Sequence, residues 1–156
     1  MGCDIHLFTE RWNKHTQKWI SFDMFEISEY YEKPTFRPIS IDDYRWYAKF
    51  AILNHECGRG KADGPKAEIR GFPDDASEYV KGEYEGWGID AHSPNWINLE
   101  EFRLLASKYR LLSGADSPLR LMSEALEAHI KRKLKWEFHI AEQKPDEIRL
   151  VYWFDN

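Results

Sequence analysis

The chain has 156 residues, of which 42% are hydrophobic, so its length and composition are those of one soluble domain with a buried core. Its formal net charge of -5 argues against binding to nucleic-acid polymers and to anionic membranes, because both require a basic surface. No apolar run reaches the roughly 18 residues of a membrane-spanning helix, and we recognise no signal peptide. We therefore expect a single domain over residues 1–156, located in the cytoplasm.

The first half of the chain predicts a β-hairpin and a helix. Residues 3–12 begin with alternating apolar and polar side chains, as in a strand, and residues 18–23 are expected to form the returning strand. Ser40, which acidic residues follow closely, resembles a helix cap, so a helix is expected over about 41–54. Residues 57–65 contain three glycines and a proline and predict a long loop.

The middle of the chain predicts shorter elements. Residues 67–70 favour a short strand, and residues 75–85 favour a short helix. Residues 88–93 are expected to be extended and to end at Pro94, because the residue before a proline disfavours the helical conformation.

The last third of the chain predicts two helices and a closing strand. Asn98 begins a capping-box pattern, which indicates a helix to about residue 112. A second helix is expected from Ser117, with proline at its first helical position. Residues 147–154 are mostly β-branched or aromatic, which is typical of a strand in the centre of a sheet.

Because strands and helices do not alternate regularly along the chain, we predict an α+β fold rather than a doubly wound sheet. The expected sheet is small and mixed or antiparallel. It includes the N-terminal hairpin and the C-terminal strand, and three or more helices pack on it. We expect the first and last strands to be neighbours, and in that case Asp155 would face the same site as Asp4.

Two Asp-x-His doublets carry the main chemical prediction. Asp4 and His6 begin the first strand, and Asp90 and His92 lie in the predicted extended piece. In a strand, residues two apart share a face and stand about 6.6 Å apart, so each doublet can direct a carboxylate and an imidazole toward one ion. These groups suit zinc, manganese, iron or nickel, and four of them meeting in one place would bind one ion tightly or two ions in a bridged pair, and so activate a bound water. The alternative is that each histidine makes only a structural hydrogen bond.

The two cysteines, Cys3 and Cys57, do not indicate a disulfide framework, and we expect reduced thiols. Cys3, His6, His55 and Cys57 are all zinc-ligand types, but His55 and Cys57 are closer in the chain than a usual structural zinc pair. A nucleophilic Cys3 is a further alternative. Because Cys3 should point to the opposite strand face from His6, a buried and inert thiol is expected there.

Arginines and tryptophans supply candidate ligand-binding groups. Arg70 and Arg45 are expected to neutralise a phosphate, and Trp87 or Trp96 to stack on a base or sugar. The glycine-rich loop around Arg59 is a second candidate cradle for phosphate. It lacks the spacing of the known phosphate-binding loops, so a mobile surface loop is the alternative.

Five stretches of the chain, which together span nearly its full length, form a recognisable set: MGCDIH at the start, RWYAKFAIL (45–53), RGFPDD (70–75), WGIDAHSPNW (87–96) and VYWFDN at the end. In these stretches the chain resembles an uncharacterised family of small phage and bacterial proteins. The resemblance implies a phage or prophage source and a compact domain, although Phe72 stands where leucine is common. It places the following residues in the recurring pieces: Asp4, His6, Arg70, Asp90, His92, Ser93 and Trp96. We therefore include Ser93 among the ligand-binding candidates.

These observations predict a small metal-assisted hydrolase that acts on a phosphoester or nucleotide, and a phage source points to a host signalling nucleotide. The four residues of the two doublets would be catalytic as well as metal ligands. The rival prediction is a non-enzymatic phage protein that sequesters a small nucleotide or binds a host defence protein, and a third is a structural or virion accessory protein. The expected partner is a small anionic ligand, and a homo-oligomer or a complex with a host protein is left open.

Overall fold

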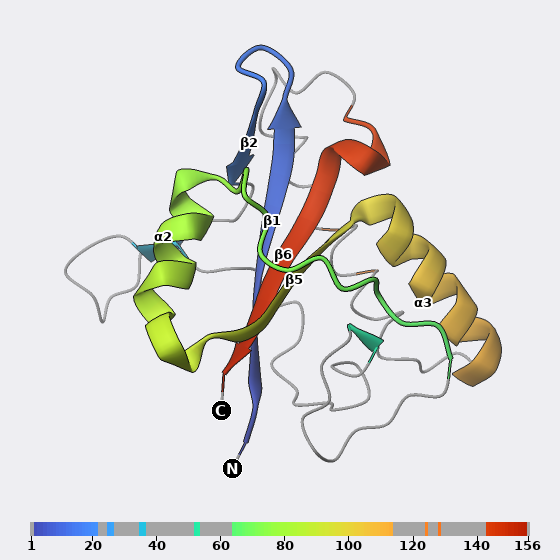
Figure 1. Cartoon of the computed structure of the whole chain (residues 1–156). Helices are drawn as coiled ribbons and strands as arrows, with labels where there is room; N and C mark the ends of the chain where they lie inside the picture. Colours follow the sequence, from blue (N-terminus) through green and yellow to red (C-terminus); the bar gives the residue numbers. More distant parts are fainter. Residues whose placement is uncertain are drawn as a thin grey trace.

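The computed structural model describes residues 2–21, 25–26, 35–36, 52–53, 64–113, 124, 128 and 143–155 (Figure 1). The strands are β1 (Asp4–Asn13), β2 (Lys18–Ser21), β3 (Phe25–Glu26), β4 (Thr35–Phe36), β5 (His92–Asn98) and β6 (Ile148–Asp155). The helices are α2 (Glu78–Trp87) and α3 (Leu99–Ser113), with the short 3-10 turns η1 (Gly88–Asp90) and η2 (Pro145–Glu147). In this described part of the chain, no helix is long and apolar enough to cross a membrane.

Four of the strands form one antiparallel sheet in the order β2-β1-β6-β5, and β3 pairs with β4 separately. The first and last strands, β1 and β6, run side by side from the pair Asp4 and Asp155 to the pair Arg11 and Ile148 (Figure 1). The predicted neighbourhood of the terminal strands is therefore confirmed. All residues of β6 from Ile148 to Phe154 are buried, as expected for a central strand.

The sheet lies between two helices, with α2 on one side and α3 on the other (Figure 1). Side chains alternate between the two faces along each strand. On the α2 side, Phe8 and Trp153 pack with Val80 in a buried cluster. On the α3 side, Tyr152 packs with Phe102 in a second buried cluster. An antiparallel sheet covered by helices in this way is an α+β fold, as predicted.

The described residues contain two α-helices, so they do not support the predicted three or more. The helices expected over about 41–54 and from Ser117 lie almost entirely outside the described residues. Helix α2 begins later than predicted because Ser77 is its N-cap, and the Ser77 hydroxyl accepts a hydrogen bond from the backbone N–H of Val80. Residues 67–70 do not form the expected strand.

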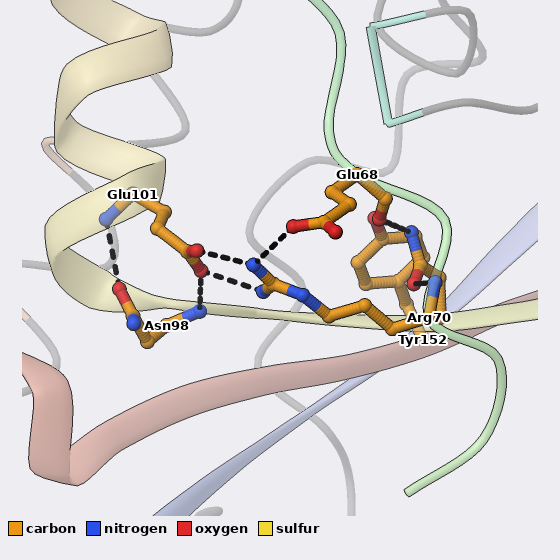
Figure 2. A network of polar contacts seen from close by, with 6 residues as sticks. Glu68, Arg70, Asn98, Glu101 and Tyr152 are labelled. Carbon is orange, nitrogen blue, oxygen red and sulfur yellow. Dashed lines mark hydrogen bonds and ion pairs between the residues drawn. The ribbon is translucent and has the colours of Figure 1, made fainter.

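The capping box at the start of α3 is confirmed. The side-chain oxygen of Asn98 accepts the backbone N–H of Glu101 at 2.8 Å, and a carboxylate oxygen of Glu101 accepts the backbone N–H of Asn98 at 3.1 Å (Figure 2). Each side chain satisfies a backbone group that the first turn of a helix leaves unpaired.

The segment after α2 differs most from its prediction. Residues 88–90 form η1, and the strand begins at His92 and continues past Pro94 to Asn98. Proline is tolerated there because β5 is an edge strand and its pairing with β6 shifts register between His92 and Asn95. At such a bulge the ladder does not require a backbone N–H from this position, and proline has none to donate.

Cys3 is buried and disulfide-bonded, so the expectation of a reduced thiol at this position is wrong. A cysteine count does not tell which thiols the fold brings within bonding distance, because that depends on tertiary structure. A disulfide sulfur is neither a free nucleophile nor a thiolate ligand, so neither alternative role of Cys3 is supported. His55 and Cys57 lie outside the described residues.

Candidate functional site

His6 on β1 and Asp155 at the end of β6 face each other at one end of the sheet. Nε2 of His6 lies 3.2 Å from Oδ2 of Asp155. The second carboxylate oxygen, Oδ1, accepts a hydrogen bond of 3.1 Å from the backbone N–H of Asp4. The side chains of His6 and Asp155 keep 21% and 19% of their surface exposed, so the pair is held in place and still reaches solvent.

The register of the strands explains why this pair forms. Asp4 is paired with Asp155, and His6 with Trp153, in the antiparallel ladder of β1 and β6. Because residues two apart in a strand share a face, Asp4, His6 and Asp155 lie on the α2 side of the sheet. Trp87, in the last turn of α2, contacts the imidazole of His6 with ring centroids 4.1 Å apart. The end of α2 therefore adds aromatic surface to the pair.

The geometry of the pair is compatible with two chemical uses. A separation of 3.2 Å suits a hydrogen bond in which the carboxylate orients the imidazole for acid–base catalysis. It also suits two neighbouring ligands of one ion, because ligands about 2.1 Å from an ion and separated by roughly 90–110° lie about 3.0–3.4 Å apart. Within the described residues, no group of three or more His, Cys, Asp or Glu side chains is placed to hold a metal ion. An ion at this pair would therefore need further ligands, such as water or substrate.

The second doublet does not join the first. Asp90 lies exposed in η1, and His92 pairs with Phe154, the residue next to the Trp153 that pairs with His6. Neighbouring residues of a strand point to opposite faces, so His6 and His92 lie on opposite sides of the sheet. The ring of His92 stacks on Phe154 with centroids 6.5 Å apart. The predicted convergence of the two doublets on one ion is not found, because an offset of one residue along β6 reverses the face.

Arg70 is bonded to protein carboxylates (Figure 2). Its Nη1 donates to Oε2 of Glu101 at 2.7 Å, and its Nη2 donates to Oε1 of Glu101 and, at 3.0 Å, to Oε2 of Glu68. Hydrogen bonding to Arg70 lowers the pKa of Glu101, and the same bond raises the pKa of Arg70. The Arg70 guanidinium also lies over the ring of Trp96, 4.5 Å from its centroid. The contacts thus give Arg70 and Trp96 structural partners within the protein.

A buried amide connects this network to the core of the sheet. Oδ1 of Asn95 accepts the backbone N–H of Arg70 at 2.9 Å, and Nδ2 of Asn95 donates to the hydroxyl of Tyr152 at 3.1 Å. The Tyr152 hydroxyl in turn donates to the backbone oxygen of Leu53 at 3.1 Å. Burial raises the pKa of Tyr152, so its hydroxyl remains protonated.

A second charged cluster was not predicted from the sequence. Arg149 is 2% exposed, its Nε donates to Oε2 of Glu10 at 2.7 Å, and its Nη1 donates to Oδ1 of Asp75 at 2.8 Å. The other carboxylate oxygen of Glu10 accepts the backbone N–H of Ser77 at 2.7 Å, which fixes the start of α2 on the sheet. The signal for this cluster was an arginine inside a largely apolar closing strand, since a buried charge requires a partner.

The remaining predicted residues lie elsewhere. Ser93 is exposed, lies in the bulge with φ of 49°, and its hydroxyl is 3.5 Å from Nδ1 of His92. Arg45 is outside the described residues. Of the predicted ligand-binding residues that the structure describes, Trp87 borders the His6–Asp155 pair.

We find no match to this chain among protein families, curated proteins or solved structures. The resemblance to a phage and bacterial family therefore stays a prediction. The candidate site is defined by geometry, and we refer to His6, Asp155, Asp4 and Trp87 together as the His6–Asp155 site.

Proposed function

We propose that this protein is a small metal-assisted hydrolase that acts on a phosphoester or nucleotide at the His6–Asp155 site. The proposal depends on one observation, the approach of Nε2 of His6 to Oδ2 of Asp155 at 3.2 Å on the sheet face that also carries Asp4. An imidazole and a carboxylate that converge at a partly exposed sheet end are donor types that manganese, zinc, iron and nickel accept.

The charges of the site favour a reaction that uses a divalent ion. The Asp155 carboxylate beside the imidazole would repel the negative charge of a phosphoester. A bound divalent ion would offset this repulsion, polarise a phosphoryl oxygen and lower the pKa of a bound water. Magnesium is often held by one or two carboxylates together with waters and substrate phosphates, and the proposal is that an ion at His6 and Asp155 completes its coordination in the same way.

The chain's own residues would have distinct roles in this proposal. His6 and Asp155 would hold the ion, and the backbone N–H of Asp4 keeps the Asp155 carboxylate oriented. Trp87 is half-buried beside His6 and offers a surface for a nucleobase. Stacking of a base on an aromatic side chain contributes about 1–3 kcal/mol.

Sequestration of a nucleotide without turnover is the second candidate. It is favoured by the absence, within the described part of the chain, of a third side chain that joins His6 and Asp155 as a metal ligand. A protein that binds a nucleotide through Trp87 and hydrogen bonds needs no ion. In both candidates the phage source, the cytoplasmic location, a host signalling nucleotide as ligand and any host-protein or homo-oligomeric partner are parts of the proposal.

Incubation of the purified protein with linear and cyclic nucleotides tests both candidates, with manganese, zinc, iron, nickel or a chelator present and with products separated by anion-exchange chromatography. Hydrolysis is expected with at least one ion and not with the chelator. His6→Ala and Asp155→Ala should reduce the rate at least about 100-fold. His92→Ala is the matched control, because it removes the same side chain from the opposite face, and it should keep the rate within about 3-fold.

The same experiment separates the two candidates. Intact nucleotide recovered from the denatured protein, without product, supports sequestration and rules out hydrolysis. Neither product nor bound nucleotide under any of these conditions rules out both.

A further inference from the structure

A groove lies at the opposite end of β1 from the His6–Asp155 site, between the β1–β2 hairpin and the start of α2. Its volume is about 780 Å³, within the range of about 300–1,000 Å³ that is usual for small-molecule sites. Trp12, Trp19 and Asp75 are among the residues that line it. No residue of the His6–Asp155 site does so, and the groove is therefore a separate place for a ligand.

Trp12 and Trp19 form an aromatic corner in this groove. They are directly paired across β1 and β2, and their ring centroids are 5.5 Å apart with the planes at 66°. Nε1 of Trp19 donates to Oδ2 of Asp75 at 3.0 Å, and the guanidinium of Arg149 lies 4.0 Å from the Trp19 ring centroid. Because the Trp19 side chain is already held in place, binding of a ligand here costs little entropy for ordering that side chain.

The charged side chains that line the groove balance each other. Lys18 and Lys81 lie there together with Asp75 and Glu78. Asp75 is also bonded to Arg149 at 2.8 Å. A site for a phosphate group normally carries an excess of positive charge, and this groove has none among its described lining residues. Its charge pattern is complementary to a ligand without net charge.

We propose that this groove binds a neutral oligosaccharide. One face of a sugar ring presents C–H groups that pack flat on an indole, and its edge carries hydroxyls that both donate and accept hydrogen bonds. Trp12 provides the aromatic surface, and Asn13, Ser77 and Asp75, whose polar side chains can form hydrogen bonds with hydroxyls, line the same groove. A nucleotide would bring a phosphate charge that the groove does not offset. This proposal is independent of the function proposed above.

A screen of neutral oligosaccharides against the full chain, followed by NMR of the protein labelled with ¹⁵N at its indole nitrogens, tests the proposal. The NMR probes are cellotetraose, maltotetraose, chitotetraose and any sugar that the screen retains, with AMP as the charged comparison. At least one sugar is expected to shift the Trp12 and Trp19 indole signals with a Kd of about 1 mM or tighter. Because the ligand is neutral, about 300 mM sodium chloride should leave that Kd unchanged.

Variants connect the signal to the groove. Trp12→Ala should weaken sugar binding at least about 10-fold, and Trp12→Phe should weaken it less, because a smaller ring remains. Trp87→Ala is the control. It removes a tryptophan of α2 that contacts His6, outside the groove, and should leave sugar binding unchanged. The proposal is wrong if no sugar shifts these signals, if AMP binds in place of the sugars, or if a folded Trp12 variant binds as tightly as the native chain.

Discussion

The side chains of His6 and Asp155 lie 3.2 Å apart although 149 positions separate them in the chain. The distance is short because β1 and β6 are antiparallel neighbours whose ladder pairs Asp4 with Asp155. In the same sheet His92 is paired with Phe154 and lies on the other face. Two histidines in similar sequence patterns therefore have different surroundings, and this difference makes them a natural pair for experiments.

Metal binding should distinguish the two histidines. We expect His6→Ala and Asp155→Ala to weaken Mn²⁺ binding at least about 10-fold, because each removes a direct ligand of the proposed ion. His92→Ala should leave the affinity unchanged. Isothermal titration calorimetry with each purified variant measures the effect. Equal Mn²⁺ affinity of the native chain and His6→Ala would contradict the proposed position of the ion.

The buried pair of Glu10 and Arg149 should be important for stability. Their side chains are 0% and 2% exposed, so Glu10→Gln leaves the Arg149 charge paired only with Asp75, whose side chain is 63% exposed, and should cost about 3–5 kcal/mol of unfolding free energy. The control is Lys14→Met, which breaks a pair with Glu147 in which Lys14 is 52% exposed, and it should cost less than about 1 kcal/mol. Urea unfolding followed by fluorescence measures both, and similar losses in the two variants would argue against this assignment.

Two glycines near the end of α2 should respond in opposite ways to alanine. Gly88 has φ of 54° and ψ of -125°, a conformation that a side chain disfavours, so Gly88→Ala should cost about 1–3 kcal/mol. Gly86 lies inside α2, and a Cβ added there would meet no atom within 4 Å, so Gly86→Ala should stabilise the protein by about 0.5–1 kcal/mol. Thermal unfolding should show the two midpoints on either side of the native value. If Gly88→Ala stabilised the protein, the fold would not require this backbone conformation at residue 88.

The hydrogen bond between Arg70 and Glu101 should make stability depend on acidity. It lowers the pKa of Glu101 from its ordinary value of 4.5. A carboxyl group whose pKa is lower in the folded state stabilises the fold above its unfolded-state pKa, and this contribution disappears as the pH falls through the folded-state pKa. Since the Glu101 side chain is 34% exposed, solvent screening limits the effect to about 1 kcal/mol.

Glu101→Gln provides the test of this pH dependence, because glutamine keeps the capping box. The melting temperature of the native chain should fall more steeply below about pH 4.5 than that of Glu101→Gln. Glu100→Gln removes the neighbouring exposed carboxylate of α3 and should leave the native pH profile unchanged. Parallel profiles of the native chain and Glu101→Gln would mean that this ion pair does not contribute.

Local patterns in the sequence predicted much of the sheet and both of the described α-helices. The alternation after Cys3 identified β1, the run of apolar residues identified β6 as a central strand, and the Asn98 capping box located the start of α3. Each of these signals depends on residues within a few positions of one another, so it can be recognised in a single segment. The continuation of β5 through Pro94 was not predicted. Proline is tolerated in a strand only at a sheet edge or a bulge, where no N–H is needed for a ladder hydrogen bond, and both features depend on strand pairing.

Only the tertiary structure decided which side chains meet. The facing of His6 and Asp155, the placement of His92 on the other face and the bonding of Arg70 to Glu101 all depend on how distant segments align. An offset of one residue between paired strands moves a side chain to the opposite face of the sheet. This offset cannot be predicted from the sequence of one strand, because it is set by how two strands pair.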